Sequence, residues 1–434
     1  MASIYDVRQL NQLVDHIQLP KMIEITQRFP RPVLADVPAE LKKVVETAGV
    51  LSRIREGESV CITAGSRGVA NMGVVLKKIV AMVKGQGGKP FVIPAMGSHG
   101  GATAEGQLQM LKSLGITEAY LGCEIRSSME TVKLGYTVPS NLPVYVDKYA
   151  SEADHTILVN RIKPHPSFSG AVESGITKMA VIGLGKQAGA SLCHGMGIQN
   201  MSASIQEIGA YLFEHGNVIF GVGLIENCFD ETCKLVCCPV EDILHQEPAA
   251  LQQAYANKAS IGFGKYDVLI VDEAGKNISG AGMDTDMVGR YTNVWIPNKN
   301  YQQVLVCLRL TEETHGNATG MGIVDIAPLA YYEQLDYVST YANLITSRVL
   351  FSAKMPMILE NDRVCIQAAI NSCVNIDYSR PRVIRIKNTL EPGRLLISEA
   401  LLEEAGSFEN VTVIGEPQAM KFDENGNLIG GWSE

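Results

Sequence analysis

The 434-residue sequence lacks long apolar runs and strong positive charge. No stretch approaches the roughly 18 uncharged apolar residues that a membrane-spanning helix needs, and the first residues show no apolar signal core. The formal net charge is −9 and no run of five basic residues occurs, so nucleic acid is not an expected partner. We therefore predict a cytoplasmic protein that binds neither membranes nor nucleic acids.

Sequence motifs for a structural zinc ion and for nucleotide binding are also missing. The 10 cysteines include no Cys-x-x-Cys pair, which argues against a structural zinc site and favours buried or unreactive thiols. Neither GxGxxG nor GxxxxGK[ST] occurs, and Gly183-Leu-Gly185-Lys186 is too short for either. A standard dinucleotide or P-loop site is therefore disfavoured.

The sequence contains a repeated alternation of short apolar strands, glycine-containing loops and segments with helical periodicity. Strands are predicted at 59–63, 89–94 and 155–160, and a second series begins with strands at 266–272 and 303–310. Strand–loop–helix repetition favours α/β architecture, with largely parallel sheets and functional groups on the loops that follow the strands.

The length of the chain favours more than one domain. We place a boundary near residue 262, which gives α/β domains at 1–262 and 263–434 with an active-site cleft between them. Residues 1–45 are predicted to form an irregular arm and the start of a helix. A single helix is predicted at about 329–347.

The segment from Asn160 to Met196 is the longest candidate functional loop. It follows a predicted strand and carries His165, Lys178 and His194 between several glycines. Long ordered loops in compact domains are usually functional. We therefore expect the rest of the chain to bring other polar groups to this loop.

Two shorter loops at equivalent strand ends carry unusual residues. Ser66 and Arg67 follow the first strand, and an arginine there can bind a carboxylate or phosphate through two hydrogen bonds. Gly97 and Gly100 flank His99 after the second strand, and they would let backbone N–H groups approach a ligand. A solvated loop arginine and a surface histidine are the simpler alternatives.

His99 and His165 lie on separate loops and could act as acid and base on opposite faces of one substrate carbon. Such a pair suits racemisation or epimerisation, and histidine can serve in either direction near neutral pH. Spacing alone does not require this arrangement.

The second half of the chain offers fewer candidates. Lys276 and Asn277 lie in a polar loop that suits a substrate with several hydroxyls, such as a sugar acid, or is simply a solvated turn. Glu273, Asp284 and Asp286 could bind a hard cation, although a solvated acidic loop is the simpler interpretation.

Taken in order, these motifs resemble the lactate racemase superfamily, whose members use a nickel-pincer nucleotide. The resemblance spans most of the chain and is strongest from Ile62 to Met196. It rests on Thr63-Ala-Gly-Ser-Arg67, Gly97-Ser-His99, Pro164-His165 with Phe168-Ser-Gly170, Lys178 and His194.

The resemblance implies a covalently held cofactor in the first domain. Lys178, and not Lys163 or Lys186, would carry the nickel-pincer nucleotide, because its distance along the chain to His194 matches the family. His194 would ligate the nickel. The remaining cofactor-binding residues would be Ser66, Arg67, Gly97 and Gly100.

The resemblance also implies the catalytic groups and the substrate class. His99 and His165 would be the paired acid and base, while Arg67 would hold the substrate carboxylate or a cofactor phosphate. Lys276 and Asn277 are our candidates for substrate binding from the second domain. The implied activity is that of a 2-hydroxyacid racemase or epimerase whose partners are a small hydroxyacid and the cofactor-biosynthesis proteins; the resemblance leaves a homo-oligomer open.

Two departures from the family argue against lactate itself as the substrate. Thr63-Ala64 stands where lactate racemases have acidic residues, and the segment between His165 and Lys178 is a few residues longer, around Glu173. Both differences fall where substrate would lie. Lactate itself is therefore not the expected substrate, and a polyhydroxylated sugar acid, which the polar loop at Lys276 and Asn277 would suit, is one candidate.

Two other functions compete with this one. The first is a metal-dependent hydrolase or lyase that uses His99, His165 and His194, against which the absence of H-x-x-x-H and H-x-H motifs counts. The second is a non-catalytic small-molecule-binding protein with the same fold, in which His99 or His165 could be replaced without loss of function.

Overall fold

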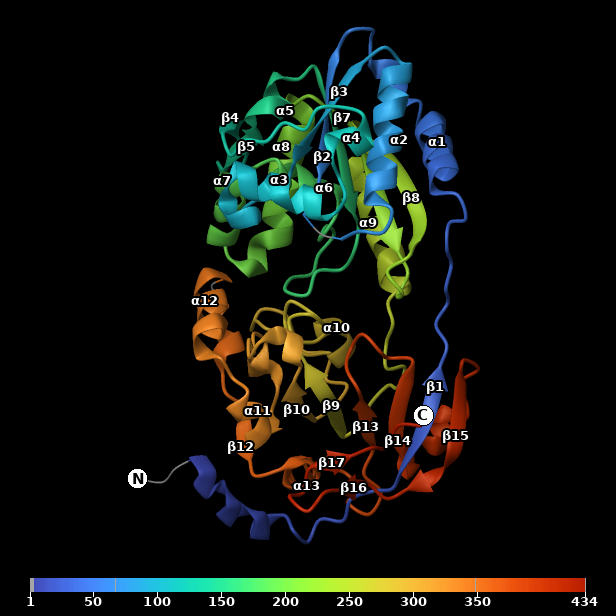
Figure 1. The fold of residues 1–434 in the computed structure, drawn as a ribbon, viewed down its shortest axis with the longest axis vertical. Helices are drawn as coiled ribbons and strands as arrows, with labels where there is room; N and C mark the ends of the chain where they lie inside the picture. Colours follow the sequence, from blue (N-terminus) through green and yellow to red (C-terminus); the bar gives the residue numbers. More distant parts are fainter. Residues whose placement is uncertain (1–3, 67, 348, 434) are drawn as a thin grey trace. The chain divides into compact units, whose positions relative to one another are not determined.

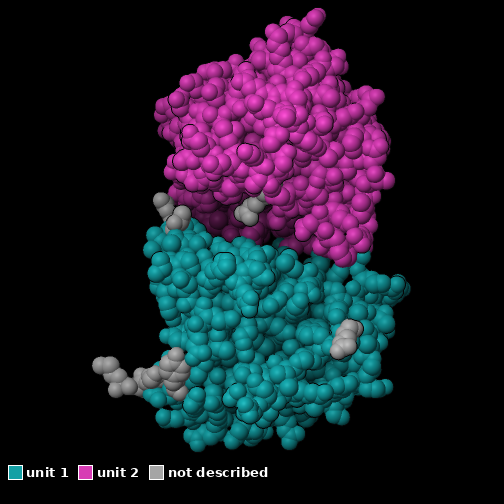
Figure 2. Space-filling view, in the orientation of Figure 1, with its two compact units in different colours: residues 1–29, 259–434 teal, residues 30–258 magenta. Residues whose placement is uncertain are grey.

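The computed structural model describes residues 4–66, 68–347 and 349–433. The chain forms two compact units, Pro30–Lys258 (unit 2) and Met1–Phe29 with Ala259–Glu434 (unit 1), coloured separately in Figure 2. The division at 258 lies close to the predicted one at 262. The first 29 residues differ from the prediction, because they belong to the unit that contains the C-terminus.

Strand β1 explains this assignment. It spans Met22–Gln27, where an irregular arm was predicted, and it pairs antiparallel with both β14 and β15 in the sheet of unit 1. Ile23 and Ile25 of β1 are buried in that unit's core. The prolines around this short segment hid a strand that is paired on both sides.

The sheet of unit 2 has five strands among the described residues, in the order β3-β2-β6-β7-β8. β3, β2, β6 and β7 run parallel, and only β8 is antiparallel to its neighbour. Their bounds are β2 Ser59–Ala64, β3 Lys89–Pro94, β6 His155–Arg161, β7 Val218–Glu226 and β8 Thr232–Pro239. The predicted parallel α/β architecture is confirmed.

Helices cover both faces of this sheet (Figure 1). Alternate residues of a strand point to opposite faces, so Val60 and Ile62 of β2 join one core cluster and Cys61 joins the other. The helices of unit 2 are α1 Val37–Ala48, α2 Met72–Gly85, α3 Ala104–Ser113, α4 Glu118–Leu121, α5 Lys148–Glu152, α6 Ile176–Lys178, α7 Lys186–Gly195, α8 Met201–His215 and α9 Ile243–Ala256. A hairpin that the sequence analysis missed consists of β4 Thr131–Tyr136 and β5 Pro143–Asp147.

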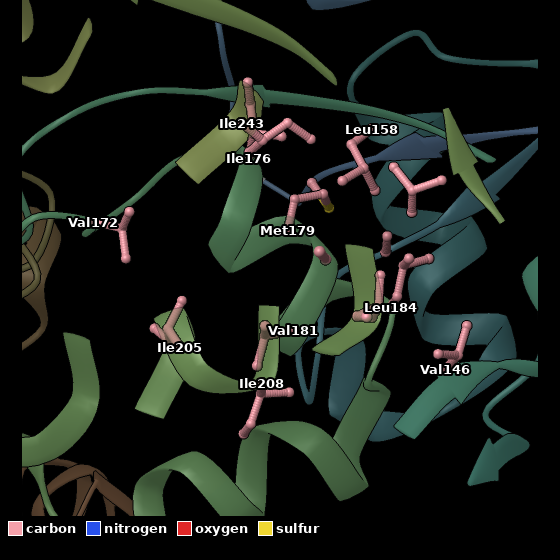
Figure 3. Packing of buried hydrophobic residues seen from close by; sticks show 14 of the residues in the cluster. Val146, Leu158, Val172, Ile176, Met179, Val181, Leu184, Ile205, Ile208 and Ile243 are labelled. Carbon is pink, nitrogen blue, oxygen red and sulfur yellow. The ribbon is translucent and has the colours of Figure 1, made fainter. Parts of the chain in front are cut away.

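The second half of the predicted loop 160–196 is helical, so that prediction was wrong beyond residue 175. Helix α6 continues through a π-helical turn at Met179–Gly183 and is followed by α7. Figure 3 shows Ile176, Val181 and other apolar side chains of this segment in the core. Its glycines are packing positions, since a Cβ on Gly183 would lie 2.9 Å from the carbonyl oxygen of Ala95.

In the part of unit 1 that the structure describes, eight strands form one sheet in the order β12-β11-β10-β9-β13-β14-β1-β15. It is parallel from β12 to β13 and antiparallel beyond. The strands are β9 Val268–Ala274, β10 Val304–Leu310, β11 Ile326–Pro328, β12 Met357–Leu359, β13 Val383–Ile386, β14 Arg394–Ser398 and β15 Val411–Gln418, with a separate pair β16 Lys421–Phe422 and β17 Leu428–Ile429.

The helices of unit 1 are short. They are α10 Thr285–Val288, α11 Leu329–Glu333, α12 Tyr337–Ser347, α13 Asp362–Ser372 and α14 Leu402–Ala405. The helix predicted at 329–347 is therefore two helices, α11 and α12. None of the described helices has both the length and the apolar character that crossing a membrane would need.

Candidate functional site

Three loops of unit 2 leave the sheet at one edge. They follow β2, β3 and β6, whose parallel pairing puts their carboxyl ends on the same side. The first two loops contact the helical segment that follows the third. A Cβ on Gly65 would lie 3.5 Å from Met179 Cε, and one on Gly97 would lie 3.1 Å from Ile182 Cγ2. The structure thus brings these predicted loops together.

The loop around His99 requires its glycines for two reasons. Gly97, Gly100 and Gly101 have φ of 60°, 66° and 66°, which is the left-handed region that side chains disfavour. A Cβ on Gly100 would also lie 2.7 Å from the carbonyl carbon of Gly106 in α3. The close approach at Gly100 is therefore between this loop and α3.

Ser66 and His99 connect the loops after β2 and β3. The hydroxyl oxygen of Ser66 lies 2.5 Å from Nδ1 of His99, and the His99 side chain is exposed. Arg67, the other candidate on the first loop, lies outside the described residues. The Ser66 contact occupies one ring nitrogen of His99 and restricts the orientation of the ring.

The loop that presents His165 is organised by Glu173. Its ends are joined by backbone hydrogen bonds in both directions between Lys163 and Ser174, of 2.9 and 3.3 Å. The buried carboxylate of Glu173 accepts the backbone N–H of His165 at 2.6 Å, that of Gly170 at 3.1 Å, and the hydroxyl of Tyr255 at 2.9 Å. From the sequence, the only sign of this arrangement is that the segment between His165 and Lys178 is longer than in the family it resembles.

The ring of Phe168 is close to both His165 and Lys178. Its ring centroid is 4.3 Å from that of His165, at an interplanar angle of 30°, and 5.4 Å from the ammonium nitrogen of Lys178. Phe168 is buried, whereas His165 and Lys178 are half-buried. The backbone N–H of Ser167 donates to Nδ1 of His165 at 3.1 Å, so the neutral ring carries its hydrogen on Nε2.

Helix α9 supports the start of the helical segment that carries Lys178. The buried carboxylate of Glu247 accepts the backbone N–H of Thr177 at 2.9 Å and also its hydroxyl hydrogen. Burial raises the pKa of Glu247, and the bonds from Thr177 oppose that shift. The residue next to Lys178 is thus anchored from a separate element.

Further along the same segment, the positive charge of Lys178 acts on the pKa of the Cys193 thiol. Burial raises the pKa of Cys193 to about 11, while the Lys178 ammonium opposes the shift. His194, the next residue, lies in the last turn of α7 with an exposed side chain. The half-buried Lys178 and the exposed His194 thus lie on the same helical segment.

Lys186, the alternative carrier considered above, is fully buried. A nucleotide-sized group cannot reach its amine without unfolding its surroundings. Burial thus favours Lys178 over Lys186 as a modified residue.

The described residues contain no group of three or more histidine, cysteine or carboxylate side chains that could hold a metal ion.

Glu273, Asp284 and Asp286, proposed above as cation ligands, have protein partners instead. Asp284 caps α10 by accepting the N–H groups of residues 286 and 287, Asp286 accepts the hydroxyl of Tyr291 at 2.6 Å, and Glu273 accepts the amide of Asn388 at 2.8 Å. Asp286 is buried, so this segment is not the solvated acidic loop of the simpler interpretation.

Lys276 and Asn277 follow β9 in unit 1. The Lys276 ammonium donates to Asn343 Oδ1 at 2.9 Å, and its backbone N–H donates to the Thr314 hydroxyl at 3.0 Å. Asn277 Oδ1 accepts the hydroxyl of Thr311 at 2.7 Å. The loops after β9 and β10 thus form one polar cluster at the carboxyl ends of their strands.

Comparison with protein families supplies the remaining observation. Residues 18–205 match the family model of the lactate racemase N-terminal domain. Over these residues the chain is similar to the N-terminal domain of lactate racemases. The predicted resemblance to the lactate racemase superfamily is confirmed by this match, which includes Ser66, His99, His165, Lys178 and His194.

Other comparisons are more distant. No curated protein sequence matches the chain. Among solved structures, the lactate racemase apoprotein from Thermoanaerobacterium thermosaccharolyticum aligns with 12% sequence identity and a TM-score of 0.43, over 78% of this chain and 97% of that one.

Proposed function

We propose that this protein is a racemase or epimerase that inverts the α-carbon of a 2-hydroxy acid, with a nickel-pincer nucleotide bound covalently to Lys178. The proposal rests mainly on residues 18–205, which match the lactate racemase N-terminal domain. The lactate racemase-like residues among them belong to loops and a helical segment that contact one another at one edge of the parallel sheet of unit 2.

The side chains at this edge suit such a cofactor. Lys178 offers an amine that is half-buried against Phe168, and His194 offers an exposed imidazole nitrogen, a donor that nickel accepts. Ser66, Gly97 and Gly100 would line the nucleotide. When bound, the cofactor would accept the α-hydrogen of the substrate as hydride and return it.

His99 and His165 would exchange the proton of the substrate hydroxyl. Nδ1 of His99 lies within hydrogen-bond distance of the Ser66 hydroxyl, and Nδ1 of His165 accepts the Ser167 N–H. Nε2 of each ring is the atom that we propose for proton exchange with the substrate. The Ser66 hydroxyl can donate or accept, which allows His99 both tautomers. His99 can therefore start with Nε2 unprotonated and accept a proton there, whereas neutral His165 starts with its hydrogen on Nε2.

Arg67 would bind the carboxylate of the substrate. Lys276 and Asn277, with the hydroxyls of Thr311 and Thr314 beside them, form a polar cluster that suits a hydroxyl-rich sugar acid. Cofactor-biosynthesis proteins are the expected macromolecular partners.

Inversion in heavy water tests this function. Protein produced with the cofactor-biosynthesis genes is incubated in D2O with D-gluconate and L-lactate, and the products are analysed by chiral chromatography and NMR. We expect inversion at C2 with protium retained there, because hydride held on a cofactor does not exchange with solvent. Deuterium at C2 would instead indicate proton abstraction and contradict the proposal.

Histidine variants complete the test. His99→Ala and His165→Ala should each lower turnover about 10²–10⁴-fold, the usual contribution of a general acid or base. His215→Ala, on the outer surface of α8, is the matched control and should have no effect. Unchanged turnover in both active-site variants would favour a site in which the histidines do no chemistry.

A further inference from the structure

Lys186 is a buried lysine at the start of α7, the helix that ends near His194. Its side chain has no exposed surface, and its ammonium nitrogen lies 3.0 Å from Oδ2 of the equally buried Asp147. The same ammonium donates to the carbonyl oxygen of Pro94 at the end of β3. Its backbone φ is 51°, a value that a lysine rarely adopts. The contacts of the Lys186 side chain therefore hold its backbone in this conformation.

The third partner of Lys186 is Gln107, a buried residue of α3. Gln107 Oε1 accepts from the Lys186 ammonium at 3.3 Å. Its amide nitrogen donates to the carbonyl oxygens of Gly97 at 3.0 Å and His99 at 3.2 Å. Because ammonium only donates and carbonyl oxygen only accepts, one orientation of the amide satisfies all three contacts.

We propose that Asp147, Lys186 and Gln107 (the buried triad) are positioning residues that fix the backbone of His99 relative to α7. The inference rests on the proposed function, in which His99 and His194 act on one substrate. The triad links the two elements that carry them, since Lys186 belongs to α7 and Gln107 holds the carbonyl of His99 itself.

The packing around the triad supports this role. A Cβ on Gly97 would lie 3.5 Å from Ala190 Cβ of α7 and 3.3 Å from the carbonyl oxygen of Ile182, so the His99 loop also rests directly on the Lys178–His194 segment. Burial raises the pKa of Asp147 and lowers that of Lys186, while their mutual attraction opposes both shifts. Asp147 Oδ1 accepts the N–H of Ala150 at 3.1 Å, whereas its Oδ2 has the Lys186 ammonium at 3.0 Å as an ion-pair partner without hydrogen-bond alignment. Polar groups placed this deeply need partners, and each member of the triad has one within it.

A purely structural role makes a different prediction. If the triad only stabilised the fold, its loss would lower stability without changing the His99 loop in the folded protein. A positioning role requires that this loop loosen while the rest of unit 2 keeps its order. Gln107 separates the two roles, because its replacement leaves the Lys186–Asp147 pair in place.

The experiment compares Gln107→Met with Gln109→Met, an exposed position on the same helix. Both are made in the cofactor-free full-length protein, so the outcome does not depend on loading. Hydrogen exchange is measured on the peptide that contains His99 and Ala102, whose amides donate to Met96 and Ser98. NMR of labelled histidine follows the ring of His99, assigned as the signal lost in His99→Asn.

For Gln107→Met we expect exchange in this peptide to rise about tenfold and the His99 ring signal to shift or broaden, with exchange in α8 unchanged. Gln109→Met should match the wild type. The double variant Lys186→Met/Asp147→Asn, which leaves no unpaired buried charge, should loosen the same peptide.

Wild-type exchange and an unchanged His99 signal in both triad variants would overturn the inference, even if the variants melt earlier. Failure of the proposed function would be seen separately, as an unmodified Lys178 in wild-type protein produced with the cofactor genes.

Discussion

The ammonium nitrogen of Lys178 lies 5.4 Å from the centre of the Phe168 ring, and the imidazole of His165 lies 4.3 Å from the same ring between centroids. One buried aromatic side chain therefore contacts both the candidate carrier of the cofactor and a candidate acid–base group. A cation near the face of an aromatic ring is attracted to it, and stacked rings restrict each other's orientation. Replacing Phe168 should affect both groups.

Phe168→Ala should lower the free energy of unfolding by about 3–5 kcal/mol, because a buried ring is lost, and should slow modification of Lys178. Urea denaturation and intact mass after co-production with the cofactor genes measure the two effects. Phe168→Leu should cost less than about 1.5 kcal/mol and still slow the modification, since leucine fills volume without a ring face. Normal modification in the leucine variant would reduce Phe168 to a packing role.

Glu173→Gln should destabilise the His165 loop by about 1–3 kcal/mol, because an amide cannot accept both N–H groups that the carboxylate accepts. Limited proteolysis between residues 163 and 174 and chemical denaturation check this outcome. Tyr255→Phe is the matched comparison, since it removes only the hydroxyl that donates to Glu173. A larger effect from Tyr255→Phe than from Glu173→Gln would contradict the assignment of Glu173 as the centre of the loop.

Glu247 should make stability depend on pH. Burial raises its folded-state pKa above the ordinary 4.5, so the folded chain binds the proton more tightly than the unfolded chain. The free energy of unfolding should therefore fall as pH rises from the ordinary carboxyl range towards the folded-state pKa. Glu247→Gln should lack this decline, and parallel curves for the two proteins in urea titrations from about pH 5 to 8 would refute it.

Gly100 and Gly101 allow conformation and packing to be separated. Both have φ of 66°, but only a Cβ on Gly100 meets α3, at 2.7 Å from Gly106 and Gln107 backbone atoms. Gly101→Ala should cost about 1–2 kcal/mol, the usual penalty for a left-handed alanine, and Gly100→Ala should cost more and displace His99. Equal melting temperatures for the two variants would show that the contact with α3 does not constrain the loop.

The sequence predicted the sheet of unit 2 well because its strands are short apolar runs that end in polar loops. Strands 59–63, 89–94 and 155–160 were placed within a residue or so of β2, β3 and β6. The same local patterns could not reveal β1, which becomes a strand only by pairing with β14 and β15, far away in sequence. Long-range pairing leaves little trace in a single sequence.

The helical segment 176–195 was missed for another reason. Glycine is a poor helix former, so Gly183, Gly185 and Gly189 indicated a loop. In the structure they allow close packing, and a Cβ on Gly185 or Gly189 would lie within 2.7 Å of the Val181 carbonyl oxygen. The candidate reactive residues were chosen from their motifs alone, whereas Glu173, Gln107 and Asp147 belong to no such motif, because only the fold brings them to these loops.

The central claim is that Lys178 carries the cofactor, and intact mass with metal analysis tests it most directly. Protein from the native host, or produced with the cofactor-biosynthesis genes, should show a nucleotide-sized mass increase that maps to Lys178, with about one nickel per chain. Lys178→Ala should lack both, Lys163→Ala should retain both, and His194→Ala should lose nickel more readily. An unmodified Lys178 and no nickel, with the biosynthetic proteins present, would contradict the account.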